Sequence, residues 1–269
     1  MGKGVSVHIG LNVVDPGKYG GWNGQLAGCI NDANAMEAVA SQLGYAAADK
    51  LIDGEATAAN VIEALEMAAS QVEAGDTLLV TYSGHGGQVR DLNKDESSGP
   101  RPDRKDETWV LFDRMVLDDE LNVVWTSLPP GARVIVVSDS CHSGSVTREI
   151  GDVVRTMPAD KNEAHVKANR ALYQEIAASV SKDAASAVPA ARVVLVSGCQ
   201  DDEVSYDGKK NGAFTEALLK TWNKGKFKGT ITELHQKTTG RLTRQHPNLF
   251  VIGGPDPTFD TAPALRIGA

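Results

Sequence analysis

The strongest constraint on the fold is a pair of short, almost uninterrupted apolar runs, Arg133–Ser138 and Arg192–Ser197. Both are rich in β-branched residues, which is typical of central strands that are covered on both faces of a sheet. Similar runs lie at Val5–Leu11 and Thr77–Tyr82, with weaker ones at Lys50–Asp53 and Asn248–Ile252. Segments with helical spacing separate these runs. The alternation predicts an α/β fold, in which helices cover both faces of a mostly parallel sheet.

The segments between the strands predict where the helices begin and end. The expected helices are Asn31–Leu43, Thr57–Glu73, Glu163–Ser181, Gly212–Trp222 and Thr230–Thr243, with Asp32 and Thr57 as candidate N-caps. Two stretches interrupt the alternation: a polar excursion over residues 91–119, with a short hairpin around Trp109–Phe112, and a long segment over residues 145–189. Long loops in a compact domain are usually functional or mobile. No segment of the sequence is convincing as a linker between two domains, so we expect one domain over residues 1–269.

Composition narrows the class of protein. The 269 residues carry a formal net charge of −8, which disfavours nucleic acid as a partner because phosphate binding needs clustered Lys and Arg. No apolar run reaches the length of a membrane span, and the N-terminus lacks the apolar core of a signal peptide. Three cysteines without a CxxC motif are typical of a reducing compartment. These features predict a cytoplasmic protein without a membrane partner.

Chemistry concentrates in two short segments, each directly after a predicted strand. Thr81–Gly87 reads TYSGHGG, and Ser138–Gly144 reads SDSCHSG. Ligands bind outside the carboxyl ends of parallel strands, so neighbouring strands would bring His85 and Cys141 together. A His beside a Cys favours the nucleophilic thiolate, and the amides of Gly86 and Cys141 are candidate donors to an oxyanion.

Simpler interpretations of these residues remain open at this point. His85 could bond a local carbonyl in a glycine-rich turn, and Cys141 could be an inert thiol in the core. Cys141, His142 and His85 could bind zinc, although no fourth ligand has a typical spacing. The loop SGHGG could cradle a phosphate, but it lacks both the Lys-Ser/Thr of a P-loop and the spacing of a dinucleotide site.

The two motifs together resemble the metacaspase branch of the caspase-like cysteine peptidases. The resemblance rests on YSGHG and DSCHSG, with LAGCINDA upstream and SGCQDDEVSYDG and GAFTEALL downstream, and it covers about Val5 to Leu249. It implies a caspase-like three-layer sandwich around a six-stranded sheet. It also implies a large half over residues 1–144, a connecting segment over 145–190 and a small half over 191–269. His85 would be the general base or acid and Cys141 the nucleophile, whereas true caspases carry QACxG at the cysteine.

The same resemblance bears on substrate choice. Metacaspases cleave after Arg or Lys, and Asp32 and Asp139 would be the acidic residues of the first specificity pocket. A carboxylate beside the nucleophile would pair with a guanidinium through charge-assisted bonds. Asp32 could equally be a helix N-cap, and Asp139 could simply bond the end of its strand. The family also places the segment with Asp202 and Ser205 along the substrate pocket.

Calcium is a further expectation that comes from the resemblance. Many metacaspases need Ca²⁺, which they bind through an acidic cluster that matches Asp106, Asp118 and Asp119, and hard carboxylate oxygens suit this ion. The further aspartate of the family falls on Arg148, which would oppose the metal, although Glu149 is adjacent. No organic cofactor is expected.

These observations predict a monomeric cysteine endopeptidase with a Cys–His dyad, whose partners are proteins or peptides with Arg or Lys at the cut. The connecting segment offers candidate self-cleavage sites at Arg148, Arg155, Lys161, Lys167, Arg170 and Lys182. Three alternatives are open: a catalytically silent scaffold, a relative with another first-pocket preference, and a small-molecule hydrolase or nucleotide-binding protein. The variant Asp32→Ala would separate the second alternative from the Arg/Lys prediction.

Overall fold

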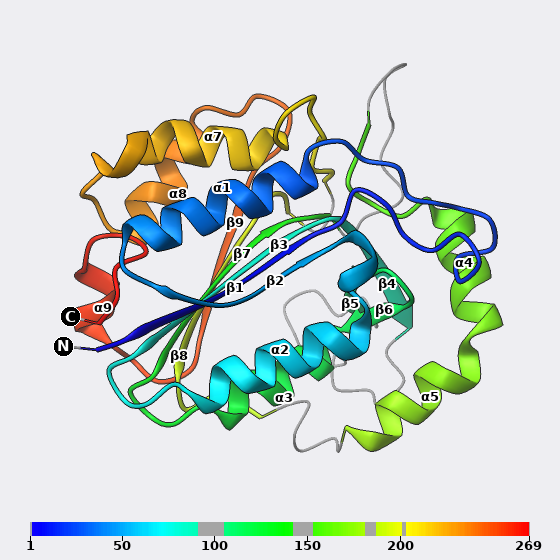
Figure 1. Ribbon diagram of the computed structural model, residues 1–269, viewed down its shortest axis with the longest axis horizontal. Coiled ribbons are helices and arrows are strands. Elements are labelled where there is room, and N and C mark those ends of the chain that lie inside the picture. Colours follow the sequence, from blue (N-terminus) through cyan, green and yellow to red (C-terminus); the bar gives the residue numbers. More distant parts are fainter. Residues whose placement is uncertain (1, 91–104, 142–152, 181–186, 201–202, 269) are drawn as a thin grey trace.

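A six-stranded sheet forms the centre of the molecule (Figure 1). The computed structural model describes residues 2–90, 105–141, 153–180, 187–200 and 203–268. The strand order is β2-β1-β3-β7-β8-β9, and every neighbouring pair is parallel except β8 and β9. The strands are β1 (Gly4–Gly10), β2 (Ala46–Ile52), β3 (Thr77–Ser83), β7 (Arg133–Asp139), β8 (Arg192–Ser197) and β9 (Asn248–Ile252). The predicted α/β class and mostly parallel sheet are therefore confirmed.

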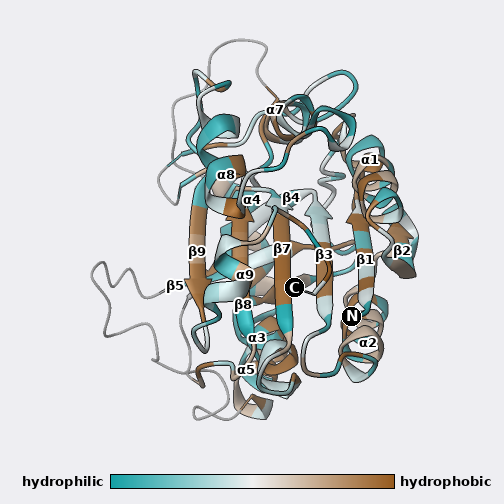
Figure 2. Ribbon diagram, turned by 90° about the vertical axis from the view of Figure 1, so that its left-hand side faces the viewer, coloured by the Kyte–Doolittle hydropathy of each residue, from teal (hydrophilic) through white to brown (hydrophobic). Residues whose placement is uncertain are grey.

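Helices cover both faces of this sheet, which gives three layers (Figure 1). On one face lie α1 (Cys29–Gln42), α7 (Ala213–Trp222), α8 (Ile231–Thr239) and the short α9 (Pro257–Thr261). On the other face lie α2 (Ala58–Ser70) and α3 (Asp118–Ser127). The central strands bury alternate residues on opposite sides, as β3 does with Leu79 on the first face and Leu78 and Val80 on the second. Figure 2 shows the central strands as the apolar interior between these layers.

A small antiparallel sheet follows directly from the carboxyl end of β3. Its order is β4-β5-β6, with strands β4 (His85–Arg90), β5 (Lys105–Val110) and β6 (Met115–Leu117). The Trp109 ring of β5 stacks on Tyr82 of β3 at 4.5 Å, and the Tyr82 hydroxyl donates to the carbonyls of His85 and Val110. These contacts fix the start of β4 against the main sheet.

Helices α4 (Ala159–Ala168) and α5 (Arg170–Ser179) lie outside the small sheet. Tyr173 of α5 is fully buried, and its hydroxyl meets both the amide of Met115 and the ring of His165. The connecting segment is thereby packed against β6 over part of its length.

The structure corrects several of the predicted elements. The single helix expected over Glu163–Ser181 is two helices that meet at Asn169, while α3 and β4 were not predicted. Thr57 caps α2 as predicted, by accepting from the amide of Asn60. Asp32 as an N-cap was wrong, because α1 begins at Cys29 and its N-cap is Gly28. The predicted hairpin near Trp109–Phe112 is confirmed as the β5–β6 pair. In the described part of the chain, no helix combines the length and apolarity that crossing a bilayer requires.

Candidate active site

The register of the main sheet places the two sequence motifs side by side. Ser83 ends β3 and pairs with Asp139 at the end of parallel β7, so His85 and Cys141 each follow two residues later at the same edge. This edge is the carboxyl end of the sheet, where ligands bind in open α/β folds. The fold therefore brings together the two residues that the sequence singled out.

The imidazole of His85 is oriented by a backbone carbonyl. Its Nε2 lies 2.9 Å from the Gly24 oxygen, and the Trp22 ring lies 4.9 Å from the His85 ring, centroid to centroid. The contact assigns the proton to Nε2, which leaves Nδ1 as a lone pair with no hydrogen-bond partner among the residues that the structure describes. Burial lowers the pKa of His85 to about 4, although the backbones of Gly24 and Thr156 oppose this effect. A neutral ring with a free nitrogen is what a general base requires.

Cys141 is buried and forms a disulfide with Cys199, whose Cα lies 6.1 Å away. The Cys141 Sγ also contacts the carbonyl oxygen of Glu203. The third cysteine, Cys29, is buried and unpaired, and burial raises its pKa to about 12. The sequence did not predict the Cys141–Cys199 pairing, because it joins two strand ends that are 58 residues apart.

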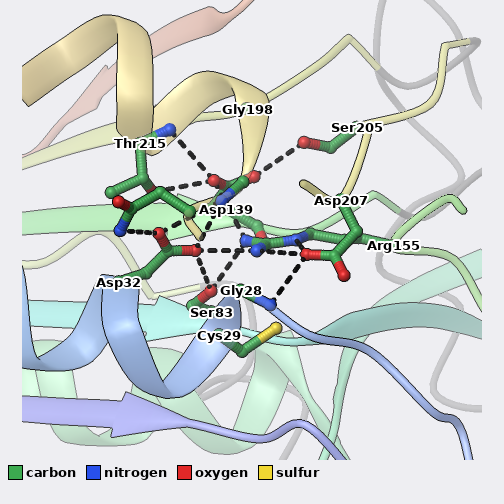
Figure 3. A network of polar contacts seen from close by, with 12 residues as sticks. Gly28, Cys29, Asp32, Ser83, Asp139, Arg155, Gly198, Ser205, Asp207 and Thr215 are labelled. Atoms are coloured by element: carbon green, nitrogen blue, oxygen red, sulfur yellow. Dashed lines mark hydrogen bonds and ion pairs between the residues drawn. The ribbon is translucent and has the colours of Figure 1, made fainter. Parts of the chain in front are cut away.

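Beside these residues lies an acidic pocket that is filled by Arg155, whose side chain is fully buried (Figure 3). The Nη2 atom of Arg155 lies 2.7 Å from Asp32 Oδ2 and 2.8 Å from Asp207 Oδ1, and its Nη1 atom lies 3.0 Å from Asp139 Oδ2. Nη1 also donates to the hydroxyl of Ser83 at 2.7 Å. Three carboxylates thus surround one guanidinium, whose several donors in one plane can serve them together.

The carboxylates are themselves held in place by neutral donors. Asp139 accepts from the Ser205 hydroxyl at 2.7 Å and from both the amide and the hydroxyl of Thr215. Asp32 accepts from Ser83 and from the Asn211 amide group. Burial raises the pKa of Asp32, and Asp139 acts in the same direction while Arg155 opposes both. These hydrogen bonds fix the positions of the carboxylates around the guanidinium.

The neighbouring carboxylates also change the pKa of the Arg155 guanidinium. Burial alone would lower the pKa of Arg155, but Asp139, followed by Asp32 and Asp207, holds it well above the ordinary value. The Arg155 charge is therefore compensated at its buried position.

The backbone of Arg155 occupies a second recognition element. Its carbonyl oxygen accepts from the amide of Gly86 at 3.1 Å and from the amide of Cys141 at 3.0 Å. These are the two amides that the sequence suggested as an oxyanion hole. Paired amides at this distance from a carbonyl oxygen would stabilise negative charge that develops on it.

The remaining residues predicted for the site fall in different places. Ser205 lies at the pocket through its bond to Asp139, whereas Asp202 lies outside the described residues. Asp106 is in β5, and Asp118 and Asp119 begin α3 directly after β6, at the same end of the small sheet. Within the described ranges no three acidic, His or Cys side chains form a group that could hold a metal ion. Arg148 and Glu149 lie outside those ranges.

Several contributors to the site were missed by the sequence reasoning, among them Gly24, Ser83 and Asp207, besides the donors Asn211 and Thr215. Gly24 acts through its carbonyl, which every residue possesses. Ser83 was part of the quoted motif, but no role was assigned to it. Asp207 stands in the quoted segment DDEVSYD, where only its acidic character could have drawn attention to it.

Comparison with known proteins shows the family to which the chain belongs. The family model of the caspase domain matches residues 12–257. Metacaspase-1A of Aspergillus terreus is 30% identical over 90% of the chain, and Metacaspase-1 of Mycosarcoma maydis is 30% identical over 83%. The chain spans 61% and 63% of the lengths of these two relatives.

Two solved structures are also similar to this one. Protein GSU0716 from Geobacter sulfurreducens is 41% identical and superposes with a TM-score of 0.86, over 97% of both chains. Caspase-1 from Spodoptera frugiperda shares the fold with a TM-score of 0.57 at 12% identity, over 99% of this chain and 88% of the other.

Proposed function

Because the chain belongs to the caspase domain family, and its curated relatives are metacaspases, we propose that it is a cysteine endopeptidase that cleaves peptide bonds after Arg or Lys. The observation that carries the specificity is the seating of Arg155 among Asp32, Asp139 and Asp207. A pocket with three buried carboxylates would leave a neutral or acidic side chain poorly compensated. It would accept a substrate guanidinium or ammonium in place of Arg155.

The proposed reaction uses Cys141 as nucleophile and His85 as base. With the disulfide reduced, the Cys141 thiol gives its proton to the free nitrogen of His85 and attacks the carbonyl carbon of the substrate arginine. The oxyanion accepts from the amides of Gly86 and Cys141, in the way that the Arg155 carbonyl does. His85 then gives the proton to the departing amine, and water hydrolyses the thioester.

Gly24 completes this proposal. By accepting from Nε2 of His85, its carbonyl fixes the tautomer and would stabilise the imidazolium that forms during the reaction. The role is the one that a carboxylate performs in a triad, carried out here by a backbone dipole.

Calcium enters no step of this mechanism. The described residues do not assemble a calcium ligand group around Asp106, Asp118 and Asp119. A requirement for Ca²⁺ remains a prediction, which the activity assay can include directly.

The test is hydrolysis of matched fluorogenic peptides that differ only at the residue before the cut. Arginine, lysine, citrulline and aspartate would be compared in a dithiol buffer, with and without millimolar Ca²⁺, and with Cys141→Ala as the blank. Citrulline keeps the shape of arginine without its charge, so cleavage of the Arg peptide at least 100-fold faster is expected. Cleavage after aspartate or citrulline at the same rate would overturn the proposed specificity, and no Cys141-dependent cleavage of any peptide would overturn the activity.

A further inference from the structure

Residues 153–157 lie across the site as a substrate would. The amide of Arg155 donates to the Ser205 carbonyl at 2.8 Å, and the amide of Asp207 donates to the Val153 carbonyl at 2.8 Å. Val154 and Tyr206 pair as an antiparallel bridge, while Thr156 pairs with Gly86 on the other side in parallel. The segment is thus bound through its backbone along both of its edges.

The side chains of residues 153–157 also lie where those of a bound substrate would lie. Arg155 fills the acidic pocket, and Val154 packs in a small apolar cluster with Cys141, Cys199 and Val204. Past the Arg155 carbonyl, the Thr156 backbone lies close enough to the His85 ring to oppose the lowering of its pKa by burial. The Met157 amide donates to the Gly86 carbonyl at 2.8 Å. The proton-carrying residue therefore lies beside the residue that would depart with the new amine.

We propose that residues 153–157 are a built-in substrate: they block the cleft against other peptides, and the Arg155–Thr156 bond is the one that the enzyme cuts in itself. The inference rests on the proposed function, because it names the first peptide bond that the proposed Arg/Lys peptidase would cut. The connecting segment contains other basic residues, among them Lys161, Lys167 and Arg170 in α4 and α5. Of the basic residues of this segment that the structure describes, only Arg155 has its carbonyl on the two amides of the oxyanion hole.

The cut requires the free thiol of Cys141. A dithiol would first reduce the Cys141–Cys199 disulfide, delivering two electrons and two protons to the sulfurs as it closes to its own disulfide. The Cys141 sulfur then bonds to the Arg155 carbonyl carbon, and the C–N bond to Thr156 breaks as His85 protonates the nitrogen. Water releases the Arg155 carboxylate and restores the thiol.

The location of the cut is tested by intact mass spectrometry after dithiol is added to the oxidised protein. We expect fragments that end at Arg155 and begin at Thr156, formed with a first-order rate constant that does not change with protein concentration. Arg155→Gln should remain whole, whereas Arg170→Gln, the same change in the same segment, should be cut like the wild type. A first cut elsewhere, a rate constant that rises with protein concentration, or unchanged cleavage of Arg155→Gln would overturn the self-cleavage.

The block is tested by binding, without any catalysis. Cys141→Ala removes both the nucleophile and the disulfide, so the seated segment alone decides access to the cleft. A fluorescent peptide that ends in Val-Arg-amide should bind at least tenfold more tightly to Cys141→Ala/Arg155→Gln than to Cys141→Ala, with Cys141→Ala/Arg170→Gln as the matched control. Equal affinities, including no binding to either protein, would overturn the block.

A second variant covers the case in which glutamine leaves the three carboxylates too poorly compensated for folding. Arg155→Lys keeps a cation but loses the several donors of the guanidinium. In the Cys141→Ala background it should raise the affinity for the peptide by less than Arg155→Gln does. With Cys141 present it should still be cut at the same bond. Fluorogenic cleavage of an Arg peptide by the wild type is the separate readout of the proposed function. If that cleavage occurs while the affinities are equal, the built-in substrate fails and the peptidase proposal stands.

Discussion

The carbonyl oxygen of Arg155 accepts a hydrogen bond from the backbone amide of Cys141 at 3.0 Å. The residue proposed to attack therefore also holds, through its amide, the carbonyl that it would attack. Binding and chemistry are coupled at one position of the chain, because the segment after β7 that carries the sulfur of Cys141 also positions its amide.

Removing one charge from the acidic pocket should reduce arginine recognition. For Asp32→Asn we expect kcat/KM on an Arg peptide to fall about 100-fold, which corresponds to roughly 2.7 kcal/mol and to the cost of leaving a buried cation poorly paired. Asp160→Asn changes an exposed carboxylate at the start of α4 and serves as the control. Equal loss in the two variants, or no loss in Asp32→Asn, would contradict the assignment of Asp32 to the pocket.

The disulfide of the nucleophile should make activity depend on a reductant. The wild-type protein, isolated without thiols, should be silent until a dithiol is added, whereas Cys199→Ala should cleave an Arg peptide without it. Cys29→Ala removes the remaining cysteine, which is buried and unpaired, and should keep the reductant requirement. Wild-type activity that is already maximal without reductant would show that Cys199 does not hold the nucleophile.

Gly24 should be needed for the position of His85. Its φ is +58°, and an added Cβ would lie 3.2 Å from Cδ2 of His85, so Gly24→Ala should lower kcat at least tenfold while KM changes little. Gly21 also has a positive φ, of +85°, but an added Cβ there meets nothing within 4 Å. Gly21→Ala therefore imposes similar backbone strain without touching the imidazole, and near-normal kcat is expected. Equal losses would mean that strain alone explains the effect.

Mild acid should destabilise the fold through buried histidine. His8 in β1 bonds the Thr81 hydroxyl at 2.8 Å through Nδ1, and burial lowers its pKa from 6.5 to about 4. Above pH 6.5 the ring is neutral whether folded or unfolded. Below it, the unfolded chain gains a proton that the folded chain refuses until about pH 4, so stability falls across this window, by roughly 3 kcal/mol at about 1.4 kcal/mol per pH unit.

Urea unfolding at pH 7 and pH 4.5 measures this contribution. His8→Asn keeps a group that can bond Thr81 but does not titrate, so it should lose markedly less stability than the wild type between the two values. His85 has a pKa lowered in the same direction, and a residual acid loss in the variant is consistent with it. An identical loss in the two proteins would remove His8 as a cause.

The sequence predicted those parts of the molecule that depend on local pattern. Apolar β-branched runs such as Arg133–Ser138 identify buried strands without reference to partners, and motifs at the ends of β3 and β7 located His85 and Cys141. The pairing of Cys141 with Cys199 could not be read in this way, because it depends on which loops the sheet order brings together. Helix boundaries failed where tertiary contacts decided them, as for Asp32, whose carboxylate is used by Arg155 instead of its own helix end.

Arg155 illustrates the same limit for function. In the sequence it is one of several basic residues in a long segment, each equally acceptable to an Arg/Lys peptidase. Its backbone contacts with Ser205, Gly86 and Cys141, together with the three carboxylates around its side chain, distinguish it in the structure. The backbone contacts involve main-chain atoms that all residues share, so no residue type announces them.

Under the proposed function, the backbone contacts along both edges of residues 153–157 would also restrict which proteins the enzyme could cut. A substrate segment must expose its main-chain donors and acceptors on both sides over about five residues. In a helix or in the interior of a sheet, these groups are already hydrogen-bonded to other backbone groups. An accessible arginine in a folded domain would therefore be spared. Targets would be interdomain tethers, chain ends and partly unfolded proteins, so that the conformational state of a target, as much as its basic residue, would decide its fate.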